Sequence, residues 1–533
     1  MTESPVTSAL ADLAAAARPG ASERGRARLL LTDYVAVANA GAAADSAWRA
    51  RNALLPASAG PAPVLGTGQR AAVRDAALLN GISAHSLELD DTHEPSSSHP
   101  GTVIWTALLA AAAARPPAMT AVLDSAVVGY QVMASLGELL GPAELYRQGV
   151  HPTAICGVFG AAAAAGRLAA LDADTIRRAF GIALSMSAGS MAYLSDGAWT
   201  KRLHSGSAAA GGILAVELAA AGFTGPLNAF EDRNGLMHIY GGARADAHAE
   251  AVLRRAGGLG AVHETSVKFH PCCRYMHGVM DLLAAYRTEG GRVEGIQRID
   301  CGVLSAGTGL VGEPLARKRT VSNMVDAQFS MPFGAALTLA RGTSSLADFQ
   351  NARAVAAGFQ QWMDRTEIHT SATLDAAYPA RWGAEVTLSF TDGEVVELRT
   401  AAFRGSPGWP ADRPEIAAKA SELLGEPAAQ RLLTALDRLD DAAMLDDAAV
   451  LDCGAMPDLA GLASAQTSAT AQPSPITPSS INPSSTTHRR LTGSSSDHAH
   501  RRPGRCRRPA AGRNAGGGAG AGCGRPVRHP AAR

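Results

Sequence analysis

Alanine-rich apolar segments follow one another from the N-terminus to about residue 265. In several of them apolar residues would occupy nearly every face of a helix, which is typical of helices buried inside a multi-helix domain. Pro116-Pro117, Gly141-Pro142 and Gly225-Pro226 interrupt this pattern, as helix ends require. Alanine dominates the apolar content and only 5% of the residues are aromatic, which argues against an all-β fold. We expect helices within residues 29–44, 72–89, 102–114, 120–141, 155–171, 175–189 and 207–222.

Short alternating segments replace the long apolar ones after about residue 266. We predict strands at residues 296–304 and 384–390, and Asp392-Gly393 suits the turn of a hairpin that residues 394–400 complete. These segments indicate a separate α+β unit.

Helical patterns resume in residues 414–425 and 428–445. Such a short helical piece would pack most simply against the N-terminal helices, which makes the α+β unit an insertion. The predicted fold is therefore mainly α. It has a large all-helical domain built from both chain ends (residues 1–266 and 401–463) and a smaller inserted α+β lid domain (residues 267–400).

Residues 464–533 form a tail rich in Ser, Thr and Pro, and then in Arg, Gly and Pro, with no aromatic residue. Because this composition cannot bury enough apolar surface to offset the ordering entropy, we predict disorder. The tail carries 11 Arg and one acid, Asp497, whereas the chain has 48 basic and 48 acidic side chains, so the rest of the chain is acidic. Clustered Arg can bind nucleic acid, but a solvated tail or an out-of-frame extension explains it better, and we do not expect a nucleic-acid partner.

The seven cysteines contain no C-x-x-C pair and are odd in number, which fits neither a disulfide framework nor a zinc site. The N-terminus carries acids where a signal peptide has basic residues. The longest apolar run, Gly101 to Ala114, is shorter than the roughly 20 residues that span a bilayer. We therefore expect a reduced, cytoplasmic protein with no membrane partner.

Polar residues gather densely in four stretches of this alanine-rich chain. The first, residues 85–101, allows a hard-metal site at Asp90 and Asp91, an acid that orients an imidazole, or a solvated loop. In the second, His151 precedes an apolar helix, whose positive end favours a neutral imidazole. The four stretches contain His85, Glu88, Asp90, Asp91, Thr92, His93 and His99; His151; Lys201, Arg202 and His204; and Lys268, His270, Arg274 and His277.

The third and fourth stretches add cations, and the fourth lies at the predicted domain boundary, where small-molecule sites usually occur. Histidines and cations in an acidic protein indicate an anionic substrate, most simply a carboxylate. Abstraction of a proton α to a carboxylate needs a base, an acid and fixed positive charge. His99, His151, Lys201 and His277 could supply these without a metal.

These stretches, with residues 222–226 and 326–337, resemble the MmgE/PrpD family, which includes 2-methylcitrate dehydratases, cis-aconitate decarboxylases and an iminodisuccinate epimerase. The resemblance runs from about residue 5 to 455. It implies a helical domain made from both chain ends, an α+β lid, a homodimer, and an active site between the domains without metal or organic cofactor.

The resemblance also implies site residues. Thr92 and His99 match the family's first polar loop, and His151, Lys201 and His277 match further site positions of the decarboxylases. Glu88 falls where some decarboxylases have Asp. Phe333 stands where decarboxylases have a Tyr, which leaves the reaction open among dehydration, decarboxylation and epimerisation.

We therefore predict a cofactor-independent lyase acting on a small di- or tricarboxylate. His99 and His277 are the predicted acid–base pair, and Asp91 is predicted to orient an imidazole. The alternatives are an epimerase, a metal enzyme with Asp90 and Asp91 as ligands, and a non-catalytic binding dimer. The predicted catalytic residues are His99, His151, Lys201, His277, Asp91 and Thr92, and the predicted substrate-binding residues are Lys201, His204, Arg274, Lys268, Glu88 and Phe333.

Overall fold

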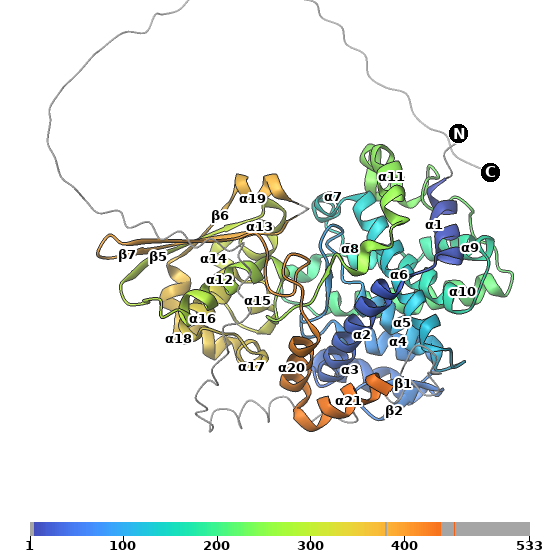
Figure 1. Cartoon of the computed structure of the whole chain (residues 1–533), viewed down its shortest axis with the longest axis horizontal. Coiled ribbons are helices and arrows are strands. Elements are labelled where there is room, and N and C mark those ends of the chain that lie inside the picture. Colours follow the sequence, from blue (N-terminus) through green and yellow to red (C-terminus); the bar gives the residue numbers. More distant parts are fainter. Residues whose placement is uncertain (1–4, 379–380, 439–451, 453–533) are drawn as a thin grey trace, which may run out of the picture. The chain divides into compact units, whose positions relative to one another are not determined.

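The computed structural model describes residues 5–378, 381–438 and 452. It is mainly α, as predicted, with small sheets (Figure 1). The predicted disorder of residues 464–533 lies outside the described residues. The N-terminal helices are α1 (Val6–Ala16), α2 (Ala21–Gly41), α3 (Asp45–Leu54), α4 (Val73–Ala84), α5 (Gly101–Ala112), α6 (Met119–Leu140), α7 (Pro142–Arg147), α8 (Pro152–Leu168), α9 (Ala173–Leu184), α10 (Thr200–Ala220) and α11 (Gly242–Ala256).

One hydrophobic core unites both ends of the described chain. Besides the N-terminal helices it contains Ile416 and Ala420 of α20 (Arg413–Leu424) and Leu432 of α21 (Glu426–Arg438). Figure 1 shows the orange α20 and α21 near the blue α2, against which both pack. Lys419 of α20 donates to Asp33 Oδ1 of α2 at 2.6 Å, and both side chains are buried. We call this core and its helices the helical part.

The second core surrounds a four-stranded sheet with strand order β6-β5-β7-β8. The predicted strands are confirmed as β5 (Ile296–Val303), β7 (Ala384–Phe390) and β8 (Val395–Thr400), and Gly393 at φ 89° occupies the turn between β7 and β8. The sequence analysis missed β6 (Thr366–Thr370), which runs parallel to β5. We call this region the sheet part. Its helices are α12 (His277–Thr288), α13 (Ser305–Val311), α14 (Leu315–Lys318), α15 (Met324–Gln328), α16 (Met331–Arg341), α17 (Leu346–Gln350), α18 (Ala352–Asp364) and α19 (Ala372–Ala377).

The helical part is not wholly helical, which corrects the sequence prediction. It contains β1 (Ala62–Val64) paired with β2 (Gln69–Ala71), and β3 (Thr92–His93) paired antiparallel with β4 (Thr265–Ser266). Two residues a side are too few to leave a readable alternation of polar and apolar residues. The β3–β4 pair joins the first polar stretch to the segment that leads into the fourth.

Close backbone contact sets the position of α10 beside α4. A Cβ on Gly81 would lie 2.4 Å from Gly206 Cα, so only glycine fits at this crossing. The contact brings the end of α4, which precedes His85, next to the first turns of α10, which carry Lys201 and His204.

Helix α6 is long and apolar enough to cross a membrane by length and composition. Most of its residues are buried inside the protein, which is the environment of a core helix. Its packing against α8 and α11 accounts for its apolar character.

Candidate active site

A small cavity brings together residues from all four polar stretches. Its walls come from both the helical and the sheet part. It is lined by Glu88, Thr92, Ser97, His99, Tyr146, His151, Met191, Tyr193, Lys201, Lys268, Cys273, Arg274, Tyr275, Leu310, Phe329 and Trp382.

Two buried lysines share one carboxylate at this cavity. Lys201 Nζ donates to Glu88 Oε1, and Lys268 Nζ lies 3.3 Å from both Glu88 Oε2 and the Glu88 carbonyl oxygen. Burial alone would raise the pKa of Glu88, but the two lysine charges lower it below its usual value. Glu88 also has a left-handed backbone with φ 55°, which costs about 1 kcal/mol or more in a non-glycine residue. The ion pairs with Lys201 and Lys268 offset this cost and stabilise Glu88 in this conformation.

Asp90 contacts two imidazoles with one oxygen. Its Oδ2 lies 2.8 Å from His85 Nδ1 and 2.9 Å from His99 Nδ1. The carbonyl oxygen of Asp91 is also 2.9 Å from His99 Nδ1. These two oxygens can only accept, and a third neighbour of His99 Nδ1, Thr92 Oγ1 at 3.4 Å, can accept as well. This nitrogen therefore carries the proton and Nε2 keeps its lone pair. Burial lowers the pKa of His99 to about 4 despite the charge of Asp90, so the imidazole is neutral at pH 7.

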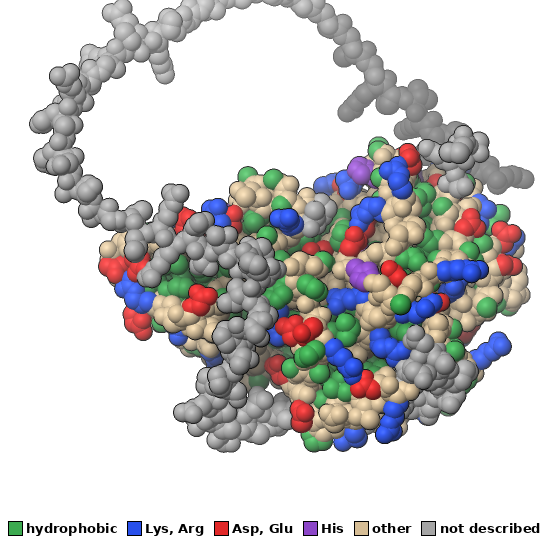
Figure 2. All heavy atoms as spheres, in the orientation of Figure 1, with side chains coloured by type: hydrophobic (Ala, Val, Ile, Leu, Met, Phe, Trp, Pro, Cys, Tyr) green, Lys and Arg blue, Asp and Glu red, His purple; other side chains and the backbone are tan. Residues whose placement is uncertain are grey.

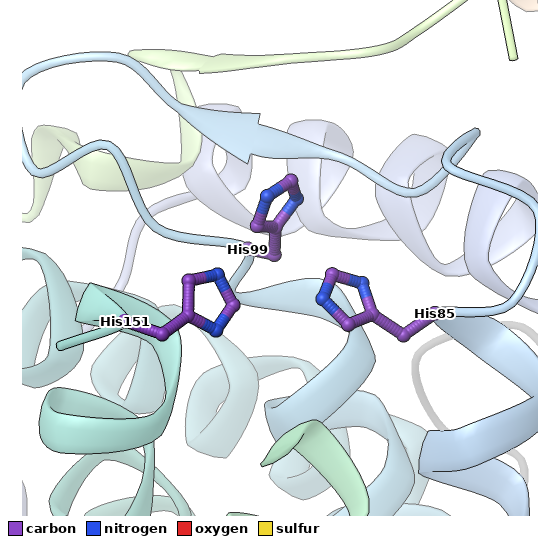
Figure 3. A group of neighbouring side chains, drawn as sticks. All are labelled: His85, His99 and His151. Atoms are coloured by element: carbon purple, nitrogen blue, oxygen red, sulfur yellow. The ribbon is translucent and has the colours of Figure 1, made fainter. Parts of the chain in front are cut away.

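His151 is a second neutral imidazole at the cavity. It is the N-cap residue of α8, and its Nδ1 lies 3.2 Å from His204 Nδ1 on α10. Burial, and then the charge of Lys201, lower the pKa of His151 well below its usual value. The rings of His99 and His151 have centroids 6.0 Å apart (Figure 3).

The sheet part contributes a cation and aromatic rings. The guanidinium carbon of Arg274 lies 3.8 Å from the Trp382 ring centroid and 4.1 Å from that of Phe403. Lysine, arginine and acidic side chains are interspersed on the face of the molecule drawn in Figure 2. In the cavity, by contrast, three cations (Lys201, Lys268 and Arg274) line one small volume, which favours an anionic ligand.

Comparison with known proteins agrees with the resemblance. The sequence model of the MmgE/PrpD N-terminal domain matches residues 8–247, and that of the MmgE/PrpD C-terminal domain matches residues 270–441. The chain belongs to the MmgE/PrpD family.

Several curated MmgE/PrpD relatives are decarboxylases by name. The chain is 27% identical over 368 residues to the cis-aconitate decarboxylase-like protein oryM of Aspergillus oryzae, covering 64% of this chain and 74% of that protein. It is 28% identical over 270 residues to the cis-aconitate decarboxylase of Aspergillus terreus, covering 48% of this chain and 54% of that enzyme. It is 24% identical over 380 residues to the cis-aconitate decarboxylase of Mus musculus, covering 69% of this chain and 75% of that enzyme. The chain thus spans about half of the Aspergillus terreus enzyme and three quarters of the other two.

The structure brings most of the predicted site residues of this MmgE/PrpD protein together. Those that line the cavity are Glu88, Thr92, His99, His151, Lys201, Lys268 and Arg274. His204 does not line the cavity but lies beside His151 and Tyr193, which both do.

The predicted role of the Asp91 side chain is wrong. Its carboxylate accepts from Tyr130 OH at 2.6 Å and from the Gly101 amide at 2.8 Å, and burial raises its pKa to about 7. Asp90 takes the predicted role of the acid that orients an imidazole. Asp91 contacts His99 through its backbone carbonyl alone. Adjacent residues in an irregular loop point in different directions, so the sequence could not separate the two acids.

His277 and Phe333 lie in the core of the sheet part and do not line the cavity. His277 is fully buried between His270 and Phe403, with ring centroids 5.1 and 5.7 Å away. Phe333 packs edge-on against Phe349 at 5.2 Å. In the fourth polar stretch the cavity is lined instead by Lys268, Cys273, Arg274 and Tyr275.

The sequence analysis assigned no role to His85 or to the aromatic residues of the cavity wall. His85 was visible in the first stretch, and its spacing from Asp90 is the only signal that could have singled it out. Tyr146, Tyr193 and Trp382 lie far apart in the sequence and have no motif around them. Only the folded chain assembles them.

One group of side chains at the cavity could hold a metal ion. Within the described part of the chain, ligand atoms of His85, His99 and His151 lie within 4.8 Å of one another (Figure 3). Asp90 orients two of these imidazoles, as carboxylates commonly do beside metal-binding histidines. Asp90 and Asp91, the ligands first considered, do not belong to the group. A reaction without metal or organic cofactor stays a prediction.

The buried position of His277 has a measurable consequence for stability. Burial, together with His270 and the nearby cations Lys268 and Arg274, lowers the pKa of His277 well below its usual value. The unfolded chain therefore takes up a proton below about pH 6.5 that the folded chain resists, so His277 weakens the fold as pH falls. The free energy of unfolding of His277→Leu, relative to that of wild type, should therefore rise by up to about 1.4 kcal/mol for each pH unit below pH 6.5.

Denaturant unfolding at pH 7 and pH 5 measures this difference. His369→Leu, which changes an exposed histidine on β6, serves as the control. An equal stability difference between His277→Leu and wild type at both pH values would contradict the prediction.

Proposed function

We propose that this protein is a lyase that removes a proton α to a carboxylate of a small di- or tricarboxylate, without a metal or organic cofactor. The observation that carries the proposal is the neutral His99, fixed at Nδ1 by two acceptors, in the same cavity as Lys201 and Lys268. A base and fixed positive charge are the two requirements of this reaction.

His99 Nε2 takes the proton from the α-carbon. As the imidazole becomes charged, ionised Asp90 stabilises it, because its oxygen lies 2.9 Å from Nδ1. The electron pair left on carbon spreads onto the carboxylate oxygens, whose growing charge Lys201 and Lys268 stabilise. In an elimination this pair forms the double bond as the β-substituent leaves with its own bonding electrons. In a decarboxylation a substrate carboxylate leaves instead as carbon dioxide, and the electron pair that stays on the carbon skeleton takes up a proton from a protonated imidazole.

Glu88 limits the charge of the lysine pair before substrate arrives. A lysine ammonium has three donors, so Lys201 can keep Glu88 as a partner while it binds a substrate carboxylate. The pairing also keeps Lys268 charged, because Glu88 and Asp90 raise its pKa against the effect of burial.

Two-base epimerisation is a second candidate, favoured by the two neutral imidazoles at one cavity. His99 would remove the proton, and His151 would return one to the other face of the carbon. Because its pKa is lowered in the free protein, His151 would gain that proton when a substrate carboxylate binds beside it. The chemistry up to the carbanion is shared, so the fate of the carbanion separates the two functions. From the family resemblance we also propose a homodimer, which sedimentation can test.

Proton NMR in deuterated water tests the proposal on citrate, 2-methylcitrate, cis-aconitate and iminodisuccinate. A lyase gives an olefinic or decarboxylated product, and an epimerase gives α-deuterated substrate without elimination. Neither exchange nor product with any of the four acids would support the binding-protein alternative. Loss of activity with a chelator and recovery with a divalent ion would favour the metal alternative, and His85, His99 and His151 would be the first ligands to test.

A further inference from the structure

We infer that Arg274 forms a second carboxylate-binding subsite in the cavity, so that the preferred ligand carries two separate carboxylates, one on the Lys201–Lys268 pair and one on Arg274. The inference rests on the proposed function only in taking the cavity as a carboxylate site.

Arg274 has unused hydrogen-bonding capacity although it is only 4% exposed. Its Nε and Nη2 atoms form no hydrogen bond within the described structure. These two nitrogens share one edge of the guanidinium plane, where their parallel N–H groups match the two oxygens of a carboxylate. Since buried donors are normally satisfied, two buried donors without a hydrogen bond on a residue that lines the cavity indicate a ligand.

Two aromatic rings hold the guanidinium without using its N–H groups, and Glu94 lies beside this edge at Nη2. Trp382 and Phe403 contact Arg274 through ring–cation interactions at 3.8 and 4.1 Å, which occupy no N–H group. Tyr275 stacks on Trp382 at a centroid distance of 4.6 Å and fixes that ring in turn. The plane of Arg274 is therefore set before any ligand binds.

Glu94 forms an ion pair with Arg274 but accepts no hydrogen bond from its Nε or Nη2. Arg274 Nη2 lies 3.2 Å from Glu94 Oε1 without the geometry of a hydrogen bond. That oxygen already accepts from Ser266 Oγ at 2.6 Å. Arg274 is thus an ion-paired cation whose best donors remain available, whereas Lys201 and Lys268 both donate to Glu88.

Three acids that share a propane skeleton test the subsite: tricarballylate with three carboxylates, glutarate with two and butyrate with one. Calorimetry measures their dissociation constants for the full-length protein. Wild type should bind glutarate and tricarballylate at least about 10-fold more tightly than butyrate. Arg274→Gln should weaken glutarate and tricarballylate about 10- to 100-fold, as expected for lost charged hydrogen bonds, and leave butyrate unchanged. Arg274→Lys should recover only part of the loss, because an ammonium has no planar pair of donors.

Arg292→Gln is the matched control. Arg292 also lies over an aromatic ring, at 4.3 Å from the Phe390 centroid, but it is at the surface of the sheet part and pairs with Asp392 and Glu394. This variant should bind all three acids like wild type. Thermal unfolding of each variant checks that the fold is kept.

Three results would overturn the inference: equal weakening of all three acids in Arg274→Gln, no weakening of any, or no binding of any acid by wild type. Absence of deuterium exchange with normal binding of the acids would contradict the proposed reaction alone. The two failures are therefore distinguishable.

Discussion

His99→Asn is expected to lower kcat/KM by about 10²- to 10⁴-fold, the range for a lost general base. Asparagine keeps a polar group of similar size but cannot accept a proton at neutral pH. Because burial lowers the pKa of His99 to about 4, the base is already neutral above about pH 5. The acid limb of the wild-type pH profile should therefore fall near pH 4 rather than near pH 6.5. Deuterium incorporation into the acid that the NMR screen identifies measures both effects.

Two further variants separate catalysis from structure. Asp90→Asn can donate an N–H to His99 Nδ1 and so favours the wrong tautomer; it should also lose at least about 10²-fold in rate. His248→Asn, at an exposed position on α11, should keep full activity. Wild-type rates for His99→Asn would remove His99 from the mechanism.

Lys419→Met should cost about 3–5 kcal/mol in the free energy of unfolding, the range for breaking a buried ion pair from one side. It leaves the Asp33 carboxylate buried without its cationic partner and removes the 2.8 Å hydrogen bond from Lys419 Nζ to the Leu89 carbonyl oxygen. Denaturant unfolding followed by circular dichroism measures the loss. The double variant Lys419→Met, Asp33→Leu should recover most of it, because no buried charge then remains.

Arg413→Gln is the control for this ion pair. Arg413 pairs with Asp437, and both side chains are more than half exposed; its loss should change stability by less than about 1 kcal/mol. If Lys419→Met were equally mild, α20 would not anchor the chain end to α2 as the geometry indicates.

Much of this fold could be predicted because its signals are local. The alanine-rich segments overlap α2, α4, α5, α6, α8, α9 and α10, although α2 and α10 begin eight and seven residues earlier than predicted. The Asp392-Gly393 turn marks the β7–β8 hairpin. Strand β6 was missed because its burial does not alternate along its length. Its parallel pairing with β5 is a long-range contact that no local pattern reports.

The sequence predicted which stretches form the candidate site better than it predicted the role of each residue. Histidines, cations and acids in a hydrophobic chain singled out the four stretches, and seven of the 15 residues named in them line one cavity. Which side of an element each side chain faces depends on packing, so Asp91 and His277 were placed wrongly and Cys273 was overlooked. Resemblance to relatives at 24–28% identity does not show which of several nearby polar residues faces the cavity.

The β3–β4 pair attaches residues 265–268 to the helical part, which therefore contributes more of the charged residues at the cavity than the sheet part does. Thr92 and His93 pair with Ser266 and Thr265, Val267 belongs to the helical core, and Lys268 contacts Glu88. Lys268 is thus built into the helical part, although the sequence places it at the start of the sheet part. The proposed base His99 and both lysines therefore belong to the helical part, and Arg274 is the next cation along the chain. We expect a chimera in which a relative's sheet part replaces the residues after Lys268 to bind different ligands while it keeps the proposed base and lysines.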